Sequence, residues 1–141
     1  CAAEYPAPML GRYTIERGRA VASLPLRQRR GLRIDTRKHT RHVLRPDAEQ
    51  VQSYLEAPGD AAWKRFAASY RSLLRERFAR ERSEFDSLAE AARARDVFLG
   101  CNCPTRKNPD PRHCHTVLAL QFMRERYPDL EIERAGALVP H

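Results

Sequence analysis

The sequence of 141 residues lacks the long apolar run that a membrane-spanning helix requires. Such a helix needs about 20 consecutive apolar residues, and every apolar stretch here is much shorter. No signal-peptide pattern, internal repeat or low-complexity tract is visible either. We therefore exclude a transmembrane helix and a repeat protein, and we expect one folded cytoplasmic domain without a membrane partner.

Cysteine is scarce, and most of it lies in one place. Of four cysteines, Cys101, Cys103 and Cys114 fall in one short segment, and the first two are too close in sequence to pair comfortably. We therefore do not expect the disulfide framework that staples small secreted domains. The pattern favours free or metal-bound thiols in a reducing, cytoplasmic setting.

Acidic residues are outnumbered by basic ones, 18 against 26, and the formal net charge is +8. Most of the excess is local, because residues 27–45 hold eight Lys and Arg residues against Asp35 alone. Such a cluster attracts polyanions. We expect DNA, RNA or another phosphate-bearing ligand to bind at Arg29, Arg30, Lys38 and Arg41. The alternative is a solvated basic face.

The order of predicted elements is typical of an α/β fold. Residues 1–11 are expected to form an N-terminal arm, followed by a single α/β domain over 12–141. Strand patterns occupy 12–16, 19–24, 31–35, 96–101 and 130–134, and helical patterns occupy 47–55, 60–78, 83–92 and 110–126. We predict a compact domain with a short, mostly parallel sheet flanked by helices, which is a Rossmann-like arrangement.

Two predicted helices have faces that belong in a core. In the helix that opens at Asp60, the apolar residues repeat in steps of three and four: Trp63, Phe66, Ala67, Tyr70, Leu73, Leu74 and Phe78. We interpret this stripe as core rather than as a platform for stacking bases. The helix over 110–126 is apolar on most sides, so we expect it to be buried against the sheet.

The loop between strand 96–101 and the next helix holds the chemistry-bearing side chains. In an α/β sheet such a loop lies at the carboxyl edge, where ligands bind. Asp110 and Pro111 are predicted to start the helix, and a helix N-terminus favours an anion. Cys114 would then lie in the first turn, where its thiolate is stabilised. Three basic residues add positive charge there: Arg106, Lys107 and Arg112.

Three interpretations of this loop remain open. In the first, zinc is held by Cys101, Cys103, Cys114 and either His113 or His115, although a C-x-C spacing is unusual for such a site. In the second, Cys114 or Cys103 is a nucleophile that a histidine assists. In the third, the cysteines are small packing residues.

Three stretches of the chain resemble the bacterial "domain of unknown function 488" family, in its YeaO-like branch. They are AWKRFAASYRSLL (62–74), FDSLAEAARARDVFLGC (85–101) and DPRHCHTVLAL (110–120). The Cys-His pair that starts a final helix in the family corresponds to Cys114 and His115, and its Asp-x-Arg corresponds to Asp35 and Arg37. The resemblance implies a compact α/β fold. The chain departs from it at Thr116, where the family often has Arg.

The strand ends predict one shared pocket. If strand 31–35 is parallel to strand 97–101, then Asp35, Arg37, His39, Cys114 and His115 could line the same cavity. The alternative is a local ion pair between Asp35 and Arg37. We favour an enzyme-like domain that acts on a nucleotide or nucleic acid, with Cys114, His115, Asp35 and Arg37 as its catalytic residues. The alternative is a non-enzymatic nucleic-acid-binding module with a structural zinc site.

Overall fold

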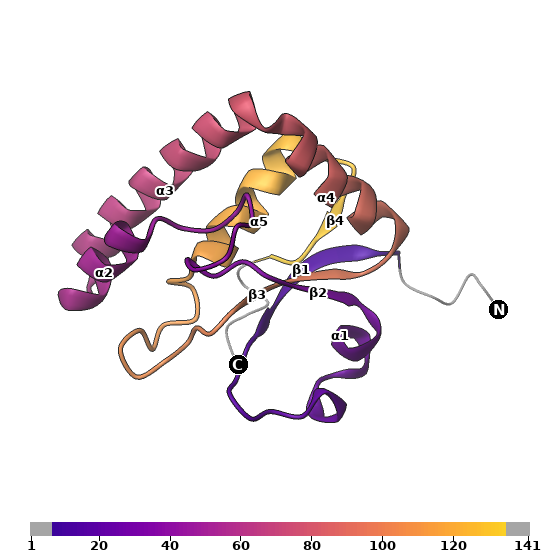
Figure 1. Cartoon of the computed structure of the whole chain (residues 1–141), viewed down its shortest axis with the longest axis horizontal. Helices are drawn as coiled ribbons and strands as arrows, with labels where there is room; N and C mark the ends of the chain where they lie inside the picture. Colours follow the sequence, from indigo (N-terminus) through magenta and orange to yellow (C-terminus); the bar gives the residue numbers. More distant parts are fainter. Residues whose placement is uncertain (1–6, 135–141) are drawn as a thin grey trace.

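The computed structural model describes residues 7–134, and its centre is a sheet of four parallel strands (Figure 1). The strands are β1 (Met9–Thr14), β2 (Leu32–Asp35), β3 (Val97–Cys101) and β4 (Glu131–Ile132), in the spatial order β2-β3-β1-β4. All three pairings are parallel, with Thr14 opposite Cys101 and Asp35 opposite Gly100. The predicted α/β fold with a parallel sheet is confirmed.

Helices cover the sheet unequally. They are α1 (Leu26–Arg30), α2 (Ala48–Glu56), α3 (Asp60–Arg80), α4 (Arg82–Ala94) and α5 (His115–Arg126). In Figure 1 the long helices α3, α4 and α5 lie on one side of the sheet, and α1 lies on the other. Right-handed crossovers explain this, because β2 to β3 and β3 to β4 both step in the same direction across the sheet. Within residues 7–134, no helix is long and apolar enough to cross a membrane.

The core lies between the sheet and these long helices. Its largest fully buried members include Leu10 and Leu99 from the sheet, Tyr70 and Leu74 from α3, and Phe85 from α4. Every residue of the predicted stripe on α3 belongs to this core or packs against it, as expected. Helix α5 is buried from His115 through Leu120, which confirms that it packs against the sheet.

Two predictions near the N-terminus are wrong. Residues 9–11 belong to β1 and not to an arm, while residues 1–6 of that predicted arm lie outside the described part. Gly11 suits this strand because a Cβ there would lie only 3.3 Å from the Phe98 ring. Residues 19–24 hold a short 3-10 helix (Val21–Ser23) and not a strand. The hydroxyl and the backbone N–H of Ser23 both donate to the Ala20 carbonyl, which closes a turn.

One carboxylate, that of Asp96, ties three elements together at the amino edge of the sheet. It precedes β3, and its Oδ1 accepts a hydrogen bond from the backbone N–H of Met9 in β1 at 3.0 Å. Arg27 of α1 donates to both carboxylate oxygens, at 2.8 and 3.0 Å. The bond from Arg27 is the main reason that the pKa of Asp96 lies below its usual value. Arg27 therefore has a structural role within the basic segment.

Replacing Asp96 with Ala is expected to lower the free energy of unfolding by about 1–3 kcal/mol, because a backbone N–H and a guanidinium both lose their acceptor. Denaturant unfolding at neutral pH measures this. The ion pair stabilises the fold above the pKa that Asp96 has in the unfolded chain. That contribution is lost as the pH falls through the lowered pKa of the folded state, so the two proteins should converge in acid.

Asp129→Ala is the matched control. Asp129 also pairs with an arginine, Arg93, at 2.7 Å, but its side chain is 57% exposed against 20% for Asp96. An ion pair this exposed is screened by water and contributes little to stability. Equal losses of stability in the two variants would contradict the anchoring role of Asp96.

Candidate functional site

A cavity of about 510 Å³ opens at the carboxyl edge of the sheet. Its wall comes from the turn after β2, helices α2 and α3, the loop after β3 and the start of α5. Side chains of three kinds line it: the aromatic residues Tyr54, Trp63 and Phe66, the basic residues Arg37, Lys38, Arg106 and Lys107, and the cysteines Cys101, Cys103 and Cys114. The volume lies in the range of small-molecule sites in proteins.

The three cysteines form one cluster, here called the cysteine cluster (Cys101, Cys103 and Cys114). Their sulfurs all lie within 4.8 Å of one another, which is close enough to hold a metal ion. All three are free thiols in the structure. Cys101 ends β3 and Cys114 precedes α5, and both are buried, whereas Cys103 lies in the loop and is half-buried.

The N-cap of helix α5 is Cys114, four residues later than the predicted N-cap, Asp110. Residues 110–113 form a turn, in which the backbone N–H of His113 donates to the Asp110 carbonyl and the Asp110 carboxylate accepts from the N–H of Arg112. The Asn108 amide then holds the His113 carbonyl at 2.5 Å, which takes this carbonyl out of any helical pattern. Cys114 therefore occupies the N-cap position of α5, with extended backbone, and not the first turn.

A buried arginine reaches the cysteine cluster through a threonine. The Nε–H of Arg12, in β1, donates to the Thr116 hydroxyl oxygen at 2.9 Å. That hydroxyl lies 3.0 Å from the Cys114 sulfur. Because the oxygen accepts from Arg12, its own proton is available to the sulfur. Arg12 is 7% exposed, and no carboxylate of residues 7–134 lies within ion-pair distance of its guanidinium. The Glu133 carboxylate accepts from the backbone N–H of Arg12 at 3.1 Å, and the charge of Arg12 counteracts the rise that burial causes in the pKa of Glu133.

His115 lies on the other side of the same sulfurs. The Thr36 hydroxyl donates to the Gly100 carbonyl at 3.0 Å and therefore accepts from His115 Nε2, which lies 3.0 Å away. Burial alone would lower the pKa of His115, but its hydrogen bonds to the sulfurs of Cys101 and Cys114 raise it to about 10. This raised pKa favours the protonated form of an imidazole that is buried beside the cysteines.

The three thiols differ sharply in acidity. Hydrogen bonds from Cys101 and Cys103, aided by His115, hold the pKa of Cys114 well below its usual value despite burial. The hydrogen bond from the Cys101 thiol to the Cys103 sulfur, at 3.7 Å, is the main reason that the pKa of Cys101 is raised. A bond from Cys101 lowers the pKa of Cys103, but its bond to Cys114 and burial together raise it to about 12. The directions of these shifts make Cys114 the most acidic of the three thiols, and His115 lies beside it.

His113 lies outside the cysteine cluster, although the sequence offered it as a metal ligand. Its ring stacks on Trp63, with centroids 4.8 Å apart. Its Nδ1 lies 3.1 Å from the Tyr54 hydroxyl and its Nε2 lies 3.7 Å from the Asp110 carboxylate. Both ring nitrogens are therefore engaged away from the sulfurs. Among residues 7–134, the cysteine cluster is the one group of three or more Cys, His, Asp or Glu side chains that could hold a metal ion.

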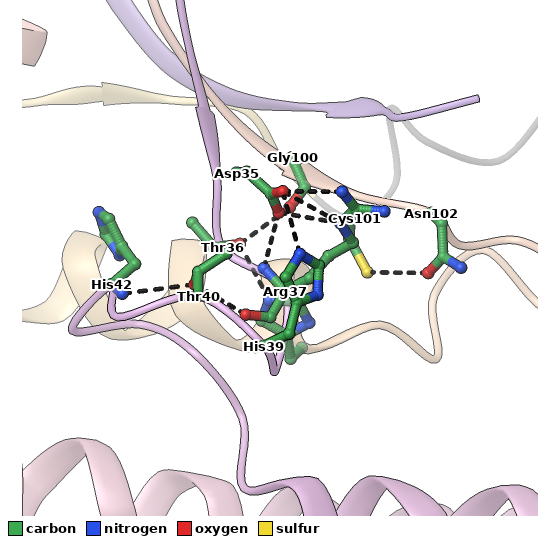
Figure 2. Close-up of polar contacts among 10 residues, drawn as sticks. Asp35, Thr36, Arg37, His39, Thr40, His42, Gly100, Cys101 and Asn102 are labelled. Carbon is green, nitrogen blue, oxygen red and sulfur yellow. Dashed lines mark hydrogen bonds and ion pairs between the residues drawn. The ribbon is translucent and has the colours of Figure 1, made fainter. Parts of the chain in front are cut away.

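The partners of the Asp35 carboxylate all come from the turn that follows β2. Its carboxylate accepts from the backbone N–H of Arg37 at 3.0 Å and from the guanidinium at 2.8 Å, and His39 lies 3.7 Å away (Figure 2). The bond from Arg37 is the main reason that the pKa of Asp35 is lowered. Arg37, His39, Cys114 and His115 line the cavity, as predicted, but Asp35 is not one of the described residues that do.

The basic residues predicted to bind phosphate fall into separate groups. One group lines the cavity: Arg37, Lys38, Arg106 and Lys107. Arg112 pairs with Asp110 at 3.0 Å and does not belong to the described lining. Arg29 and Arg30 lie in α1, before β2, and so at the opposite edge of the sheet. Arg41 is exposed after β2, away from the described lining.

No role in the site was predicted from the sequence for three residues that shape it: Arg12, Thr36 and Tyr54. The role of Arg12 could have been suspected from the sequence, because it is the single charged residue of a strand that is otherwise apolar or uncharged. The other two had none, because their contacts to His115 and Asn108 join segments that are far apart in sequence.

The chain belongs to the family DUF488-N3a, described as the active DUF488-N3 subclade, whose family model matches residues 20–127. The predicted membership of the 488 family is thereby confirmed. The match includes the cysteine cluster, His115 and Thr116, whereas Arg12 lies before it. No curated protein and no solved structure matches the chain.

Proposed function

We propose that this member of the 488 family is a thiol-dependent enzyme that acts on a phosphate-bearing small molecule of the nucleotide class. The Cys114 thiolate forms a bond to the electrophilic atom of the ligand, and the leaving group departs with the electron pair and takes a proton from His115. Water then attacks the same atom and gives a proton to His115. This step breaks the bond to sulfur and restores the thiolate.

The observation that carries this proposal is the contact chain from Arg12 through Thr116 to Cys114, at 2.9 and 3.0 Å. A packing cysteine needs no such donor, and because Arg12 donates to the Thr116 oxygen, the hydroxyl proton is free to stabilise an anionic sulfur at Cys114. This series of contacts leads to the sulfur of Cys114, which lines the cavity. A thiolate stabilised there would lie next to a ligand bound in the cavity. The N-terminus of α5 favours the same charge state.

The cavity walls support the ligand class. Lys38, Arg106 and Lys107 are exposed at its rim and have no carboxylate of residues 7–134 within ion-pair distance. Cations placed in this way suit phosphate oxygens. The lining also includes the aromatic residues Tyr54, Trp63 and Phe66. A cavity that combines basic and apolar lining suits a small molecule with phosphate at one end and an apolar ring at the other.

A second function is favoured by the spacing of the sulfurs. The cysteine cluster can supply three ligands to zinc, which prefers tetrahedral sites and thiolate ligands. The fourth position would face the cavity, and the charges of Arg12 and His115 would offset the anionic thiolates. A structural zinc of this kind fits a non-enzymatic module that binds nucleic acid through its basic residues.

Thr116→Val is expected to slow alkylation of Cys114 by about tenfold or more, because the thiolate loses a hydrogen bond that is worth about 1.5–3 kcal/mol. The chelator-treated protein is mixed briefly with iodoacetamide at neutral pH, and mass spectrometry of the peptides gives the rate for each cysteine.

Thr116→Ser keeps the hydroxyl and is the matched control, so its rate should stay close to that of the wild type. Thermal unfolding of both variants shows whether the fold is retained. A Cys114 that reacts equally fast in the Val variant, or that reacts in none of the proteins until they are unfolded, would argue against a thiolate nucleophile.

A double variant, Arg106→Ala with Lys107→Ala, is expected to weaken the binding of ADP by about tenfold or more, because two charged contacts to phosphate are lost. Isothermal titration at low and moderate salt measures the affinity. Arg29→Ala with Arg30→Ala removes the same charge from α1, at the other edge of the sheet, and should leave the affinity unchanged. Equal losses in both double variants would mean that only the net charge matters.

Metal analysis separates the two functions. Protein purified without chelator is expected to contain much less than one zinc per chain and to keep its melting temperature after treatment with chelator. Stoichiometric zinc, together with unfolding when the metal is removed, would favour the structural module instead.

A further inference from the structure

The cysteine cluster holds more thiols than a single nucleophile needs. Cys114 lies with Cys101 and Cys103 inside a 4.8 Å group of sulfurs, and all three residues line the cavity. None of the three forms a disulfide in the structure. A thiolate with a neighbouring thiol, both within reach of a small molecule, is the arrangement that allows a disulfide to form after oxidation.

The two neighbours of Cys114 differ in their freedom to move. Cys101 is the last residue of β3, is 5% exposed, and its carbonyl accepts a bond from the Ile15 N–H at 2.9 Å. Its backbone is therefore fixed in the sheet. Cys103 lies in the loop and is half-buried. Its sulfur accepts from the Asn108 amide at 3.5 Å and from the Cys101 thiol at 3.7 Å, and its carbonyl accepts from Arg12 and Thr14. Because Cys103 is the more exposed of the two, its side chain has more room than that of Cys101 to rotate toward Cys114.

A bridge between Cys101 and Cys103 is the less favourable outcome. The two residues are separated by Asn102 alone, and a disulfide needs its Cα atoms about 4.4–6.8 Å apart with the Cβ atoms directed toward each other. Closing so small a ring would pull the end of β3 out of its pairing with Thr14. Cys103 and Cys114 come from separate segments, and closing a bond between them leaves β3 in place.

We propose that the cysteine cluster is an oxidation-sensitive site, in which a hydroperoxide oxidises Cys114 and Cys103 then closes a disulfide with it. The Cys114 thiolate attacks the peroxide oxygen, the O–O bond breaks, and the products are a sulfenic acid at Cys114 and, after protonation, water or an alcohol. The Cys103 thiol then attacks the Cys114 sulfur. The S–O bond breaks, a second water leaves, and two sulfurs have been oxidised by one peroxide.

This inference rests on the proposed function, because it uses Cys114 as the nucleophile. The disulfide removes that nucleophile, so peroxide switches the site off. It also protects Cys114, since a sulfenic acid with no thiol partner is oxidised further and irreversibly to a sulfinic acid. A thiol reductant restores the reduced cysteine cluster.

Peptide mapping of the full chain tests the proposal. Chelator-treated protein is mixed with hydrogen peroxide, the remaining thiols are blocked, and the protein is digested with trypsin without reductant. Cys101 and Cys103 stay together in peptide 96–106, and Cys114 lies in peptide 113–124. The expected product is a linked pair of these peptides, about 2 Da lighter than their sum, which disappears after reduction. Fragmentation of the pair should locate the bond at Cys103.

Two cysteine variants show which residue forms the disulfide with Cys114. In Cys103→Ser the linked pair should be lost, and peptide 113–124 should instead become about 32 Da heavier, as a sulfinic acid. In Cys101→Ser, the matched control, the linked pair should persist. A bond located at Cys101, a bridge within peptide 96–106, or a linked pair that survives in Cys103→Ser would overturn the assignment.

The outcomes also separate this inference from the proposed function. If Cys114 of the wild type is alkylated rapidly but peroxide yields no linked pair, the oxidation site is wrong and the thiol enzyme stands. If Cys114 resists both iodoacetamide and peroxide in the folded, chelator-treated protein, both proposals fail.

Discussion

The site depends on the hydrogen bonds that one buried guanidinium donates. Arg12 lies in β1, the strand that pairs with both β3 and β4, and its side chain reaches across to two other elements. It donates to Thr116 in α5 and to the Cys103 carbonyl in the loop, both at 2.9 Å. A single charge thus fixes the start of the helix and the loop relative to the sheet. Cys101 is held separately, as the last residue of β3.

The parallel sheet makes this arrangement accessible to a ligand. Because all four strands run in one direction, β1, β2 and β3 end at the same edge, and the side chains that follow them meet there. The pairing of Asp35 with Gly100 brings Thr36 to the Gly100 carbonyl, and Thr36 in turn orients His115. His115 is therefore positioned by the sheet register and not by the loop alone.

Much of the fold could be predicted from the sequence, because the signals were local. The stripe on α3 has the helical period, and the apolar run before Cys101 is typical of a buried strand. The predictions were wrong where a side chain competed with the backbone. Ser23 closes a turn where a strand was expected, and Asp110 and Asn108 delay the start of α5 by holding the backbone in a turn.

The site was predictable only in part, for a different reason. The crowding of cysteines was visible, but the contacts that distinguish their roles join residues about 100 positions apart, such as Arg12 and Thr116. No local pattern encodes such a contact. His113 shows the converse: its sequence neighbours suggest a metal ligand, yet its stacking on Trp63 removes it from the cysteine cluster.

The most direct test of the account is the ultraviolet absorbance of thiolate in the folded, chelator-treated protein at neutral pH. We predict a signal of about one thiolate per chain. This signal should be lost in Cys114→Ser and strongly reduced in Thr116→Val, while Thr116→Ser keeps it. A wild-type protein without thiolate absorbance, or a signal that persists in Cys114→Ser, would contradict the conclusion that Arg12 and Thr116 hold a charged sulfur at this site.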